Sequence, residues 1–281
     1  MRPYLLAAML CGALLAPAAA PATVAPATAR IDAGQRALWV WSSPDSELLR
    51  FAGRHGIDTL YVHVPPGHAS DRVFRRLARR AADAGIALWA MAGHPRWANE
   101  TRTVVRWARE VVRSGLYEGL VVDIEPYVLD AWKTDERAAL LRRYLRRLRR
   151  AAQSSGGLPF LATVPFWYDH DRYRHRGRSL LDQVLEAVDG IVVLVYRDRA
   201  TGSDGILTLA AGEVSRAADL GKQAVLGIQT AADELDKLTF FEEGGVAMET
   251  ELDTVVTALR NAPGFGGIAI HHYNSLRRLR D

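Results

Sequence analysis

Eight short apolar segments recur along this chain, and longer segments with a helical spacing of apolar residues separate them. They cover residues 37–41, 59–64, 86–93, 119–125, 159–165, 190–196, 224–229 and 267–273. These segments are rich in β-branched, aliphatic and aromatic residues, as expected for strands that are buried on both faces of a parallel sheet. The alternation therefore predicts a series of β/α units.

The intervening segments predict helices near 46–55, 71–84, 101–114, 135–154, 179–187, 207–220 and 249–261, with a short last helix over 275–281. Several of them begin at Ser, Thr or Asp, the residue types that cap helix N-termini. Eight such units in about 250 residues predict a single-domain (β/α)8 TIM barrel. An open α/β sheet is the alternative fold, although no glycine-rich dinucleotide-binding or phosphate-binding motif follows any of the strands.

The first 20 residues have the features of a secretory signal peptide, with Arg2 before a short apolar stretch and a run of small residues at its end. This segment contains Cys11, the only cysteine, so the mature chain has no cysteine for a disulfide. Residues 21–33 are rich in Ala, Pro and Thr, and we interpret them as a flexible lead-in to a barrel domain over 34–281. No segment offers the roughly 20 apolar residues of a membrane span. We expect a secreted or periplasmic protein that is a monomer.

The formal net charge is +4, and the basic residues are nearly all arginine. The densest run of arginines lies between residues 142 and 150, where apolar residues recur at helical spacing. We interpret these arginines as the solvated face of a helix. Acidic polysaccharide or an envelope surface would suit the positive charge, and we expect no nucleic-acid partner.

The fourth apolar segment, EGLVVDIEPY, ends in two acids, Asp123 and Glu125. Side chains alternate along a strand, so Val121, Asp123 and Glu125 should share one face, with the acids about 7 Å apart. A buried carboxylate is costly unless it is paired or hydrogen-bonded, and two acids at one strand end indicate a catalytic pair. Beside the charge of Asp123, Glu125 should hold a proton more readily, which suits a general acid. A structural acid pair is the alternative interpretation.

A TIM barrel has its active site at the C-terminal ends of its strands, so residues that are scattered in this sequence should meet at one mouth. Aromatic faces together with a few acids and hydrogen-bonding groups suit sugar rings. The residues that we expect to bind substrate are Trp41, His63, His94, Tyr127, Trp167, Asp169, Arg197, Asp198, Gln229, His271, His272 and Tyr273. The predicted partner is a polysaccharide or an oligosaccharide.

The segment from Glu118 to Glu125 resembles DGxDxDxE, the fourth-strand motif of the chitinase-like glycoside hydrolases. The resemblance implies that Glu125 is the general acid and that Asp123 positions an acetamido group of the substrate. The ending VVLVYRD of the sixth segment is similar to the strand tip at which that family carries a tyrosine, which implies a catalytic role for Tyr196. The sequence departs from the motif at Glu118 and Val121, which stand where the family has Asp.

Three functions stay open. The leading hypothesis is a secreted glycoside hydrolase without a cofactor, in which Glu125 works either with a second carboxylate, Asp169 or Asp198, or with an assisting group of the substrate that Tyr196 holds. A metal-dependent hydrolase would use the histidines and acids of the mouth, but no metal motif with defined spacing is present, so we predict no metal site. A non-catalytic carbohydrate-binding barrel is the third hypothesis, and Val121 in place of an acid favours it.

Overall fold

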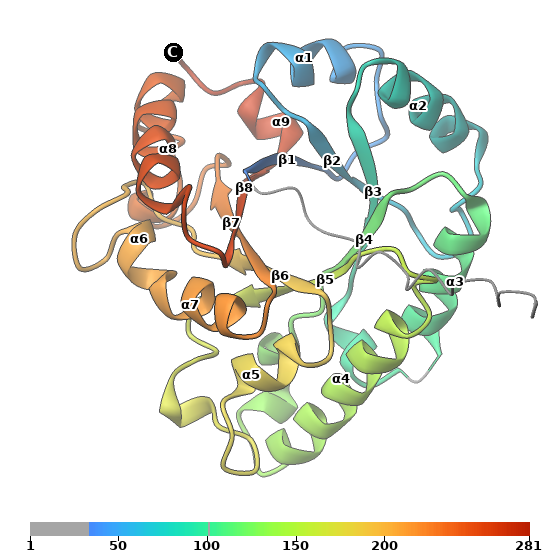
Figure 1. Ribbon diagram of the computed structural model, residues 1–281, viewed down its shortest axis with the longest axis vertical. Coiled ribbons are helices and arrows are strands. Elements are labelled where there is room, and N and C mark those ends of the chain that lie inside the picture. The colour runs from blue at the N-terminus through green and yellow to red at the C-terminus, as the bar shows by residue number, and fades with distance from the viewer. Residues whose placement is uncertain (1–33, 101) are drawn as a thin grey trace, which may run out of the picture.

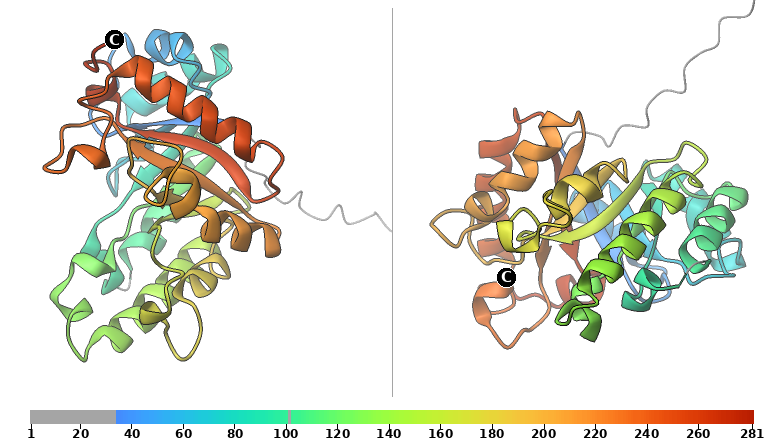
Figure 2. Two further views of the ribbon diagram at one scale, coloured as in Figure 1. Left: turned by 90° about the vertical axis from the view of Figure 1, so that its left-hand side faces the viewer. Right: turned by 90° about the horizontal axis from the view of Figure 1, so that it is seen from below.

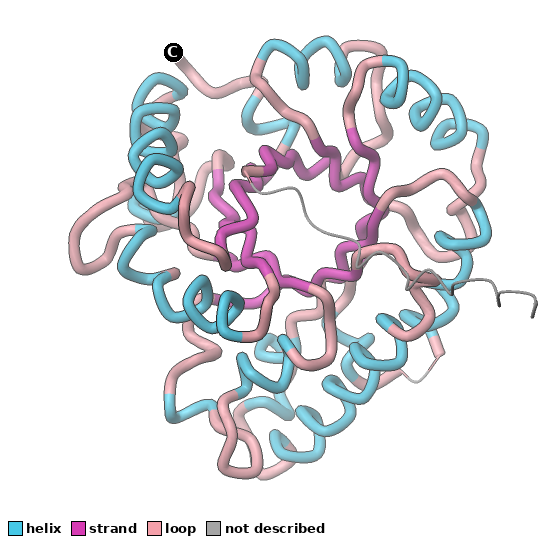
Figure 3. The backbone as a smooth tube through the Cα atoms, viewed as in Figure 1, coloured by secondary structure: helices cyan, strands magenta, loops and turns pink. Residues whose placement is uncertain are grey.

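The computed structural model describes residues 34–100 and 102–281, in which eight parallel strands form a closed barrel. Each strand pairs with its neighbours in chain order, and β1 (Gln35–Val40) closes the ring by pairing with β8 (Phe265–His271) (Figure 3). The strands between them are β2 (Thr59–His63), β3 (Ala87–Ala92), β4 (Gly119–Val122), β5 (Phe160–Pro165), β6 (Gly190–Leu194) and β7 (Gln223–Gln229). The predicted (β/α)8 barrel is therefore confirmed, whereas the predicted signal peptide and lead-in lie outside the described residues.

Helices surround this ring, as Figure 1 shows. They are α1 (Leu48–Arg54), α2 (Arg72–Asp83), α3 (Thr103–Ser114), α4 (Arg137–Ala152), α5 (Leu180–Leu185), α6 (Ile206–Leu209), α7 (Ala211–Asp219), α8 (Gly245–Leu259) and α9 (Tyr273–Leu276). The segment 207–220, predicted as one helix, is divided at Ala210 into α6 and α7. Helix α8 packs against β8 (Figure 2). Within the described part of the chain, no helix has the length and apolar character needed to cross a membrane.

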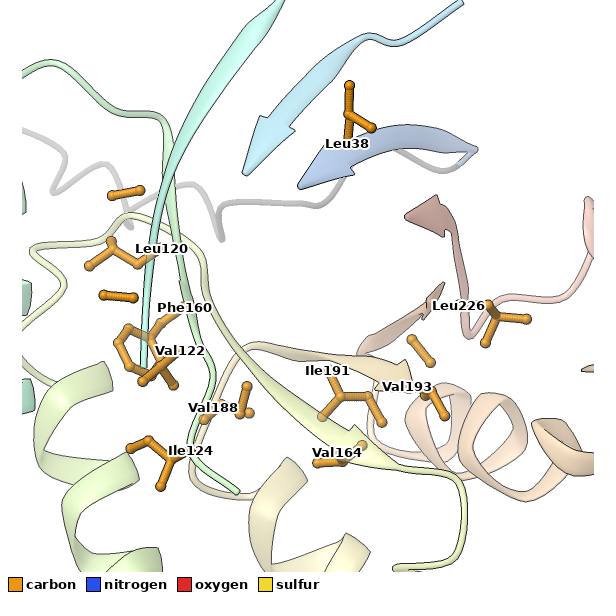
Figure 4. Packing of buried hydrophobic residues seen from close by; sticks show 14 of the residues in the cluster. Leu38, Leu120, Val122, Ile124, Phe160, Val164, Val188, Ile191, Val193 and Leu226 are labelled. Carbon is orange, nitrogen blue, oxygen red and sulfur yellow. The ribbon is translucent and has the colours of Figure 1, made fainter. Parts of the chain in front are cut away.

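The larger part of the core lies between the strands and the surrounding helices. Leu120, Val122 and Phe160 are fully buried there and point outward from β4 and β5 (Figure 4). From the helix side, α4 contributes buried residues including Leu140 and Tyr144, while most of its arginines are exposed. This arrangement agrees with our interpretation of the arginine run as the solvated face of a helix.

A second, smaller core fills the inside of the barrel. Its fully or nearly fully buried members are Ala37, Trp39, Tyr61, Trp89, Met91, Val121, Leu161, Val192, Val225 and Ala269. The strand register aligns Trp39, Tyr61 and Trp89 on β1, β2 and β3, and Gly119 follows on β4. A Cβ atom at Gly119 would lie 2.4 Å from the Trp89 ring, so this glycine leaves the room that the indole occupies. Side chains thus close the barrel below its mouth.

Candidate active site

Asp123 lies on the inner surface of the barrel, directly above the inner core. Met91, Val121 and Leu161 are aligned on β3, β4 and β5, so the next inward positions along these strands are Gly93, Asp123 and Thr163. The Thr163 hydroxyl, only 3% exposed as a residue, donates a hydrogen bond of 2.5 Å to Oδ1 of Asp123. On the other side, a Cβ atom at Gly93 would lie 1.8 Å from the carbonyl oxygen of Asp123, so the backbone of β3 can approach closely only because this residue is glycine. Both neighbours hold Asp123 in place.

Glu125 lies in the loop after β4, because the strand ends at Val122 and is shorter than predicted. The backbone N–H of Asp123 still donates to the carbonyl of Ala92, whereas Pro126, which has no N–H to donate, begins the 3-10 helix η2 (Pro126–Val128). The hydroxyl of Tyr127 in that helix donates a hydrogen bond to Oε1 of Glu125. Glu125 and Tyr127 are both partly exposed, so the turn holds Glu125 at the rim of the mouth.

The two acids influence one another electrostatically. Burial and the negative charge of Glu125 together raise the pKa of Asp123 to about 6, although the hydrogen bond from Thr163 acts in the opposite direction. Asp123 therefore retains a proton to a higher pH than an ordinary aspartate does. The carboxyl pair can hold a proton in mildly acidic solution, as general acid catalysis requires.

Aromatic side chains at the ends of β1, β2 and β8 contact one another at the same mouth. The ring centroid of Trp41 lies 5.5 Å from that of His63, and its Nε1 donates a hydrogen bond of 2.8 Å to Nε2 of His271. Burial and the neighbouring His272 lower the pKa of His271 to about 4, so its imidazole is neutral at higher pH and can accept this bond.

Tyr196 links this group of aromatic side chains to the two acids, Asp123 and Glu125. Its ring centroid lies 6.0 Å from that of His271. Burial raises the pKa of Tyr196, and the charges of Asp123 and Glu125 raise it further, so it remains a phenol that can donate a hydrogen bond. The structure therefore brings together Trp41, His63, Asp123, Glu125, Tyr127, Tyr196 and His271 of the predicted site.

Trp167 and Tyr127 belong to a group of five rings that we call the aromatic cluster. Its members are Tyr127, Trp132, Trp167, Tyr168 and Tyr173, from the loops that follow β4 and β5. The ring centroid of Trp167 lies 4.4 Å from that of Tyr173 and 5.2 Å from that of Tyr127. Trp132 and Tyr168 are buried and the other three rings are partly exposed. The cluster supports Tyr127, which in turn holds Glu125.

Arg197 and Tyr273, also predicted for the mouth, are engaged elsewhere. The buried guanidinium of Arg197 pairs with Asp204 at 2.8 Å and lies over the Phe166 ring. The hydroxyl of Tyr273 donates to Asp45 at 2.9 Å, and its ring lies in the outer core. Both residues therefore stabilise the structure around the mouth.

The two acids considered as a second carboxylate lie on other elements. Asp169 is exposed and faces helix α7, where a Cβ atom at Gly212 would lie 2.4 Å from its Oδ2. Asp198 pairs with Arg199 at 3.4 Å in the loop after β6. Among the described contacts, none joins either acid to the carboxyl pair, so Asp123 is the acid that lies beside Glu125.

The remaining predicted residues also have local partners. The amide of Gln229 donates to Asp233 at 2.8 Å, and the exposed His94 accepts a hydrogen bond of 3.1 Å from the backbone N–H of Arg96. His272 is partly exposed, and its ring centroid lies 4.9 Å from that of His271. These three residues lie at the ends of β7, β3 and β8, around the constellation described above.

Sequence reasoning missed Thr163 and Tyr144. Thr163 could have been found from alternation, because it shares the inward face of its strand with Leu161. Tyr144 is fully buried on α4, and the charges of Asp123 and Glu125 add to burial in raising its pKa. In the sequence, Tyr144 has only the spacing of a buried residue in a helix, which does not mark it as part of a site.

In residues 34–100 and 102–281, no three or more His, Cys, Asp or Glu side chains form a group that could hold a metal ion. His63 and His271 instead contact the ring of Trp41. The metal-dependent alternative therefore has no assembled set of ligands in this part of the chain.

Solved chitinase structures have the same barrel. A GH18 chitinase from Cycas revoluta in complex with (GlcNAc)3 matches with a TM-score of 0.55 and 14% identity, over 86% of this chain and 96% of that chain. A chitinase from Aspergillus fumigatus matches with a TM-score of 0.55 and 14% identity, over 86% and 92% of the two chains. A chitinase from Chromobacterium violaceum matches with a TM-score of 0.54 and 10% identity, over 86% of this chain and 95% of that chain.

The likeness to these chitinases concerns the fold. A D-psicose 3-epimerase from Clostridium cellulolyticum also matches, with a TM-score of 0.51, 12% identity and coverage of 85% and 84% of the two chains. No protein-family model matches the sequence, and no curated protein matches it. The chain has the barrel fold of the chitinase-like glycoside hydrolases, so the predicted resemblance is confirmed at the level of the fold.

Proposed function

We propose that this protein is a glycoside hydrolase that acts on a polysaccharide or an oligosaccharide, with Glu125 as the general acid. One observation carries the proposal. Asp123 and Glu125 lie at the C-terminal end of β4 in a chitinase-like barrel, and each is held by a hydroxyl group, that of Thr163 for Asp123 and that of Tyr127 for Glu125. This is the end of the barrel at which enzymes of this architecture carry out their chemistry.

In the proposed reaction, Glu125 protonates the oxygen of the leaving sugar, and Asp123 keeps the proton available to the pair. Asp123 suits this role because it is protonated below about pH 6 and lies deeper in the barrel than Glu125. The Tyr127 hydroxyl orients the carboxyl group of Glu125. Proton transfer by a positioned carboxyl group of this kind contributes about 10² to 10⁴ to the rate.

Glu125 needs a partner that acts at the sugar carbon of the bond to be cleaved. A substituent of the substrate suits this role better here than a second carboxylate of the protein. Asp123 adjoins Glu125 on one strand end instead of facing it across a substrate, and Asp169 and Asp198 lie on other elements. In this proposal the Tyr196 phenol holds the assisting group, and the support is that the charges of both Asp123 and Glu125 act on it. The proposed substrate class is therefore a glycan with an acylated amino sugar next to the bond that is cleaved.

The site of action that we propose is outside the cytoplasm. The basis is the sequence of the first 20 residues, with its apolar stretch and small-residue end. A glycan-degrading enzyme that is secreted or periplasmic would meet envelope and matrix polysaccharides.

A non-catalytic carbohydrate-binding barrel is the second candidate. The observation that favours it is Val121, which is fully buried in the inner core where the family motif has an acid. Such a protein would retain the aromatic mouth and bind glycans without turnover.

The variant Glu125→Gln tests the proposed acid. The amide keeps the shape of the side chain but cannot donate the carboxyl proton, so turnover should fall by about 10² to 10⁴ while glycan affinity and melting temperature stay near those of the wild type. The measurement is hydrolysis and binding of a panel of amino-sugar oligosaccharides. Full activity in Glu125→Gln would exclude Glu125 as the acid, and wild-type binding without turnover across the panel would favour the non-catalytic candidate.

A further inference from the structure

Positive charge is concentrated on three consecutive helices, α2, α3 and α4, which follow one another along one side of the barrel (Figure 1). These helices contain fifteen arginines but only two acidic residues, although the whole chain has a net charge of just +4. The rest of the chain therefore has more acidic than basic residues. The asymmetry distinguishes this side of the molecule from the others.

Thirteen of these arginines are exposed, and we call them the arginine face. The arginine face consists of Arg72, Arg75, Arg76, Arg79, Arg80, Arg106, Arg109, Arg113, Arg137, Arg142, Arg146, Arg149 and Arg150. Among the described residues, Arg106 alone in this set has a carboxylate within ion-pair distance, Glu110 at 3.7 Å. Elsewhere on the molecule, arginines such as Arg36 and Arg216 pair with acids of the chain. Like charges gathered with so few counter-charges repel one another, and an anionic partner would relieve this repulsion.

A hollow of about 420 Å³ lies within the arginine face, between the start of α2 and helix α3. Arg75 and Arg113 line it, together with two acids that are already engaged. Glu110 accepts a hydrogen bond of 2.7 Å from the backbone N–H of Gly67, and Asp71 contacts His68 at 2.9 Å. The guanidinium groups of Arg75 and Arg113 and the hydroxyl of Ser70 are the side-chain polar groups of the hollow that could bind a ligand.

We propose that the arginine face binds an acidic polysaccharide, with its carboxylates on the arginines and one of its sugar units in the hollow. Guanidinium groups match carboxylates in a two-pronged geometry that lysine cannot reproduce. The volume of the hollow is within the range of small-molecule sites, roughly 300 to 1,000 Å³. This binding does not depend on the activity proposed for the mouth.

The surface suits a polysaccharide better than a membrane or a nucleic acid. Helices that lie on a membrane present large apolar residues to the lipid, but the arginine helices expose only one such residue in the described chain, Val73 at 39%. Single-stranded nucleic acids stack their bases on exposed aromatic rings, whereas the aromatic residues of α2, α3 and α4 are buried. A flexible acidic chain can follow three helices around a curved surface.

The experiment measures binding of polygalacturonate to the full chain by isothermal titration calorimetry, with neutral dextran as the reference polymer. The first variant, Arg142→Gln/Arg146→Gln/Arg149→Gln, removes three charges from the middle of α4. Its control, Arg54→Gln/Arg260→Gln/Arg280→Gln, removes three exposed charges on other elements. Both triple variants have the same net charge.

We expect the α4 variant to bind polygalacturonate at least 10-fold more weakly, with a smaller salt dependence, and the control to differ less than 2-fold from the wild type. A second variant, Arg75→Gln/Arg113→Gln, should show a similar loss if the hollow holds a sugar unit. Equal losses in both triple variants would overturn the proposal, because net charge alone would then explain binding. Tighter binding to anionic phospholipid vesicles or to duplex DNA than to polygalacturonate would also overturn it. Hydrolysis at the mouth should be unaffected by all three variants on a neutral oligosaccharide.

Discussion

At Asp123, burial and the charge of Glu125 both favour the protonated carboxyl group, and the hydroxyl of Thr163 opposes them. In the motif DGxDxDxE, a further acid stands two residues before this aspartate. Val121, which replaces that acid, is part of the inner core and has no polar group to offer. The protonation of Asp123 is therefore set by a neutral hydrogen bond from β5 and by the adjacent Glu125.

Two substitutions, one beside the carboxyl pair and one within it, should move the pH dependence of activity in opposite directions. Activity should fall as the pH rises through about 6, because the pair then loses the proton that it delivers. Thr163→Val removes a hydrogen bond that favours the ionised Asp123, so the fall should move to higher pH, by roughly 1 pH unit. Asp123→Asn removes the carboxyl group whose raised pKa sets the fall near pH 6, so the fall should move to lower pH.

Thr163→Ser is the matched control for these profiles, since it keeps the hydroxyl group and should leave the midpoint near that of the wild type. Carbon-13 NMR titration of the Asp123 carboxyl group gives the same comparison without relying on turnover. If Thr163→Val and Thr163→Ser had the same midpoint, the hydrogen bond would have no part in setting the protonation of Asp123.

Among the elements, the two loops after β4 and β5 depend on one another through the aromatic cluster. Trp132 from the first loop stacks on Tyr168 from the second, with ring centroids 6.1 Å apart and an angle of 15° between the rings. The loops also contain short 3-10 helices, η3 (Asp130–Trp132) and η4 (Asp171–Tyr173), that each end in a ring of the cluster. The orientation of Tyr127, and through it of Glu125, is therefore a property of both loops.

Trp167→Ala should destabilise both loops and weaken glycan binding at once. The indole contacts four rings of the cluster, so its removal should lower the free energy of unfolding by about 2 to 3 kcal/mol, less than for a fully buried tryptophan. Urea unfolding and glycan binding are the measurements, and Trp167→Phe should recover part of both losses. Unchanged unfolding in Trp167→Ala would show that the cluster contributes no stability.

Helix α7 contains a carboxyl group that should make stability depend on pH. Glu213 is 0% exposed, and neither of its oxygens has a hydrogen-bond partner among the described residues. Burial, together with the charge of Asp169, raises its pKa to about 9. Between pH 4.5 and about 9, the folded protein therefore keeps a proton on Glu213 that the unfolded chain has released. The free energy of unfolding is then highest at low pH and falls as the pH rises towards 9.

Glu213→Gln replaces this group with a neutral one of the same shape. The variant should match the wild type near pH 5 and exceed it in stability by up to about 5 kcal/mol near pH 9. Thermal unfolding of both proteins between pH 5 and pH 9 measures the difference. Parallel curves for the two proteins over this range would show that Glu213 does not titrate as the burial of its side chain requires.

At the scale of the whole molecule, the barrel closes through the pairing of β1 with β8, and that pairing starts at Gln35. We therefore expect a chain that starts at Gly34 to fold and to keep the melting temperature of the longer chain. Circular dichroism and thermal unfolding of the two chains provide the comparison. Failure of the shorter chain to fold would show that residues before Gly34 are part of the domain.

The architecture could be predicted from the sequence because its causes are local. Runs of apolar residues bounded by helical patterns identify buried strands and amphipathic helices wherever they occur, and eight of each in succession leave few folds besides a closed barrel. The same local reasoning found Asp123 and Glu125, since acids at the end of an apolar strand stand out against their neighbours. It also overestimated the length of that strand, because Pro126 starts a turn soon after Val122.

Only the tertiary structure decided which side chains meet at the mouth. The register between β4 and β5 aligned Thr163 with Asp123, 40 residues away in the chain. Contacts with other elements engaged Arg197, which lies over the Phe166 ring, and Tyr273, which donates to Asp45, 228 residues distant. Alternation along a strand determines the face on which a residue lies, but the partner of that residue depends on how neighbouring strands are shifted and how their loops pack, and these are properties of the closed barrel as a whole.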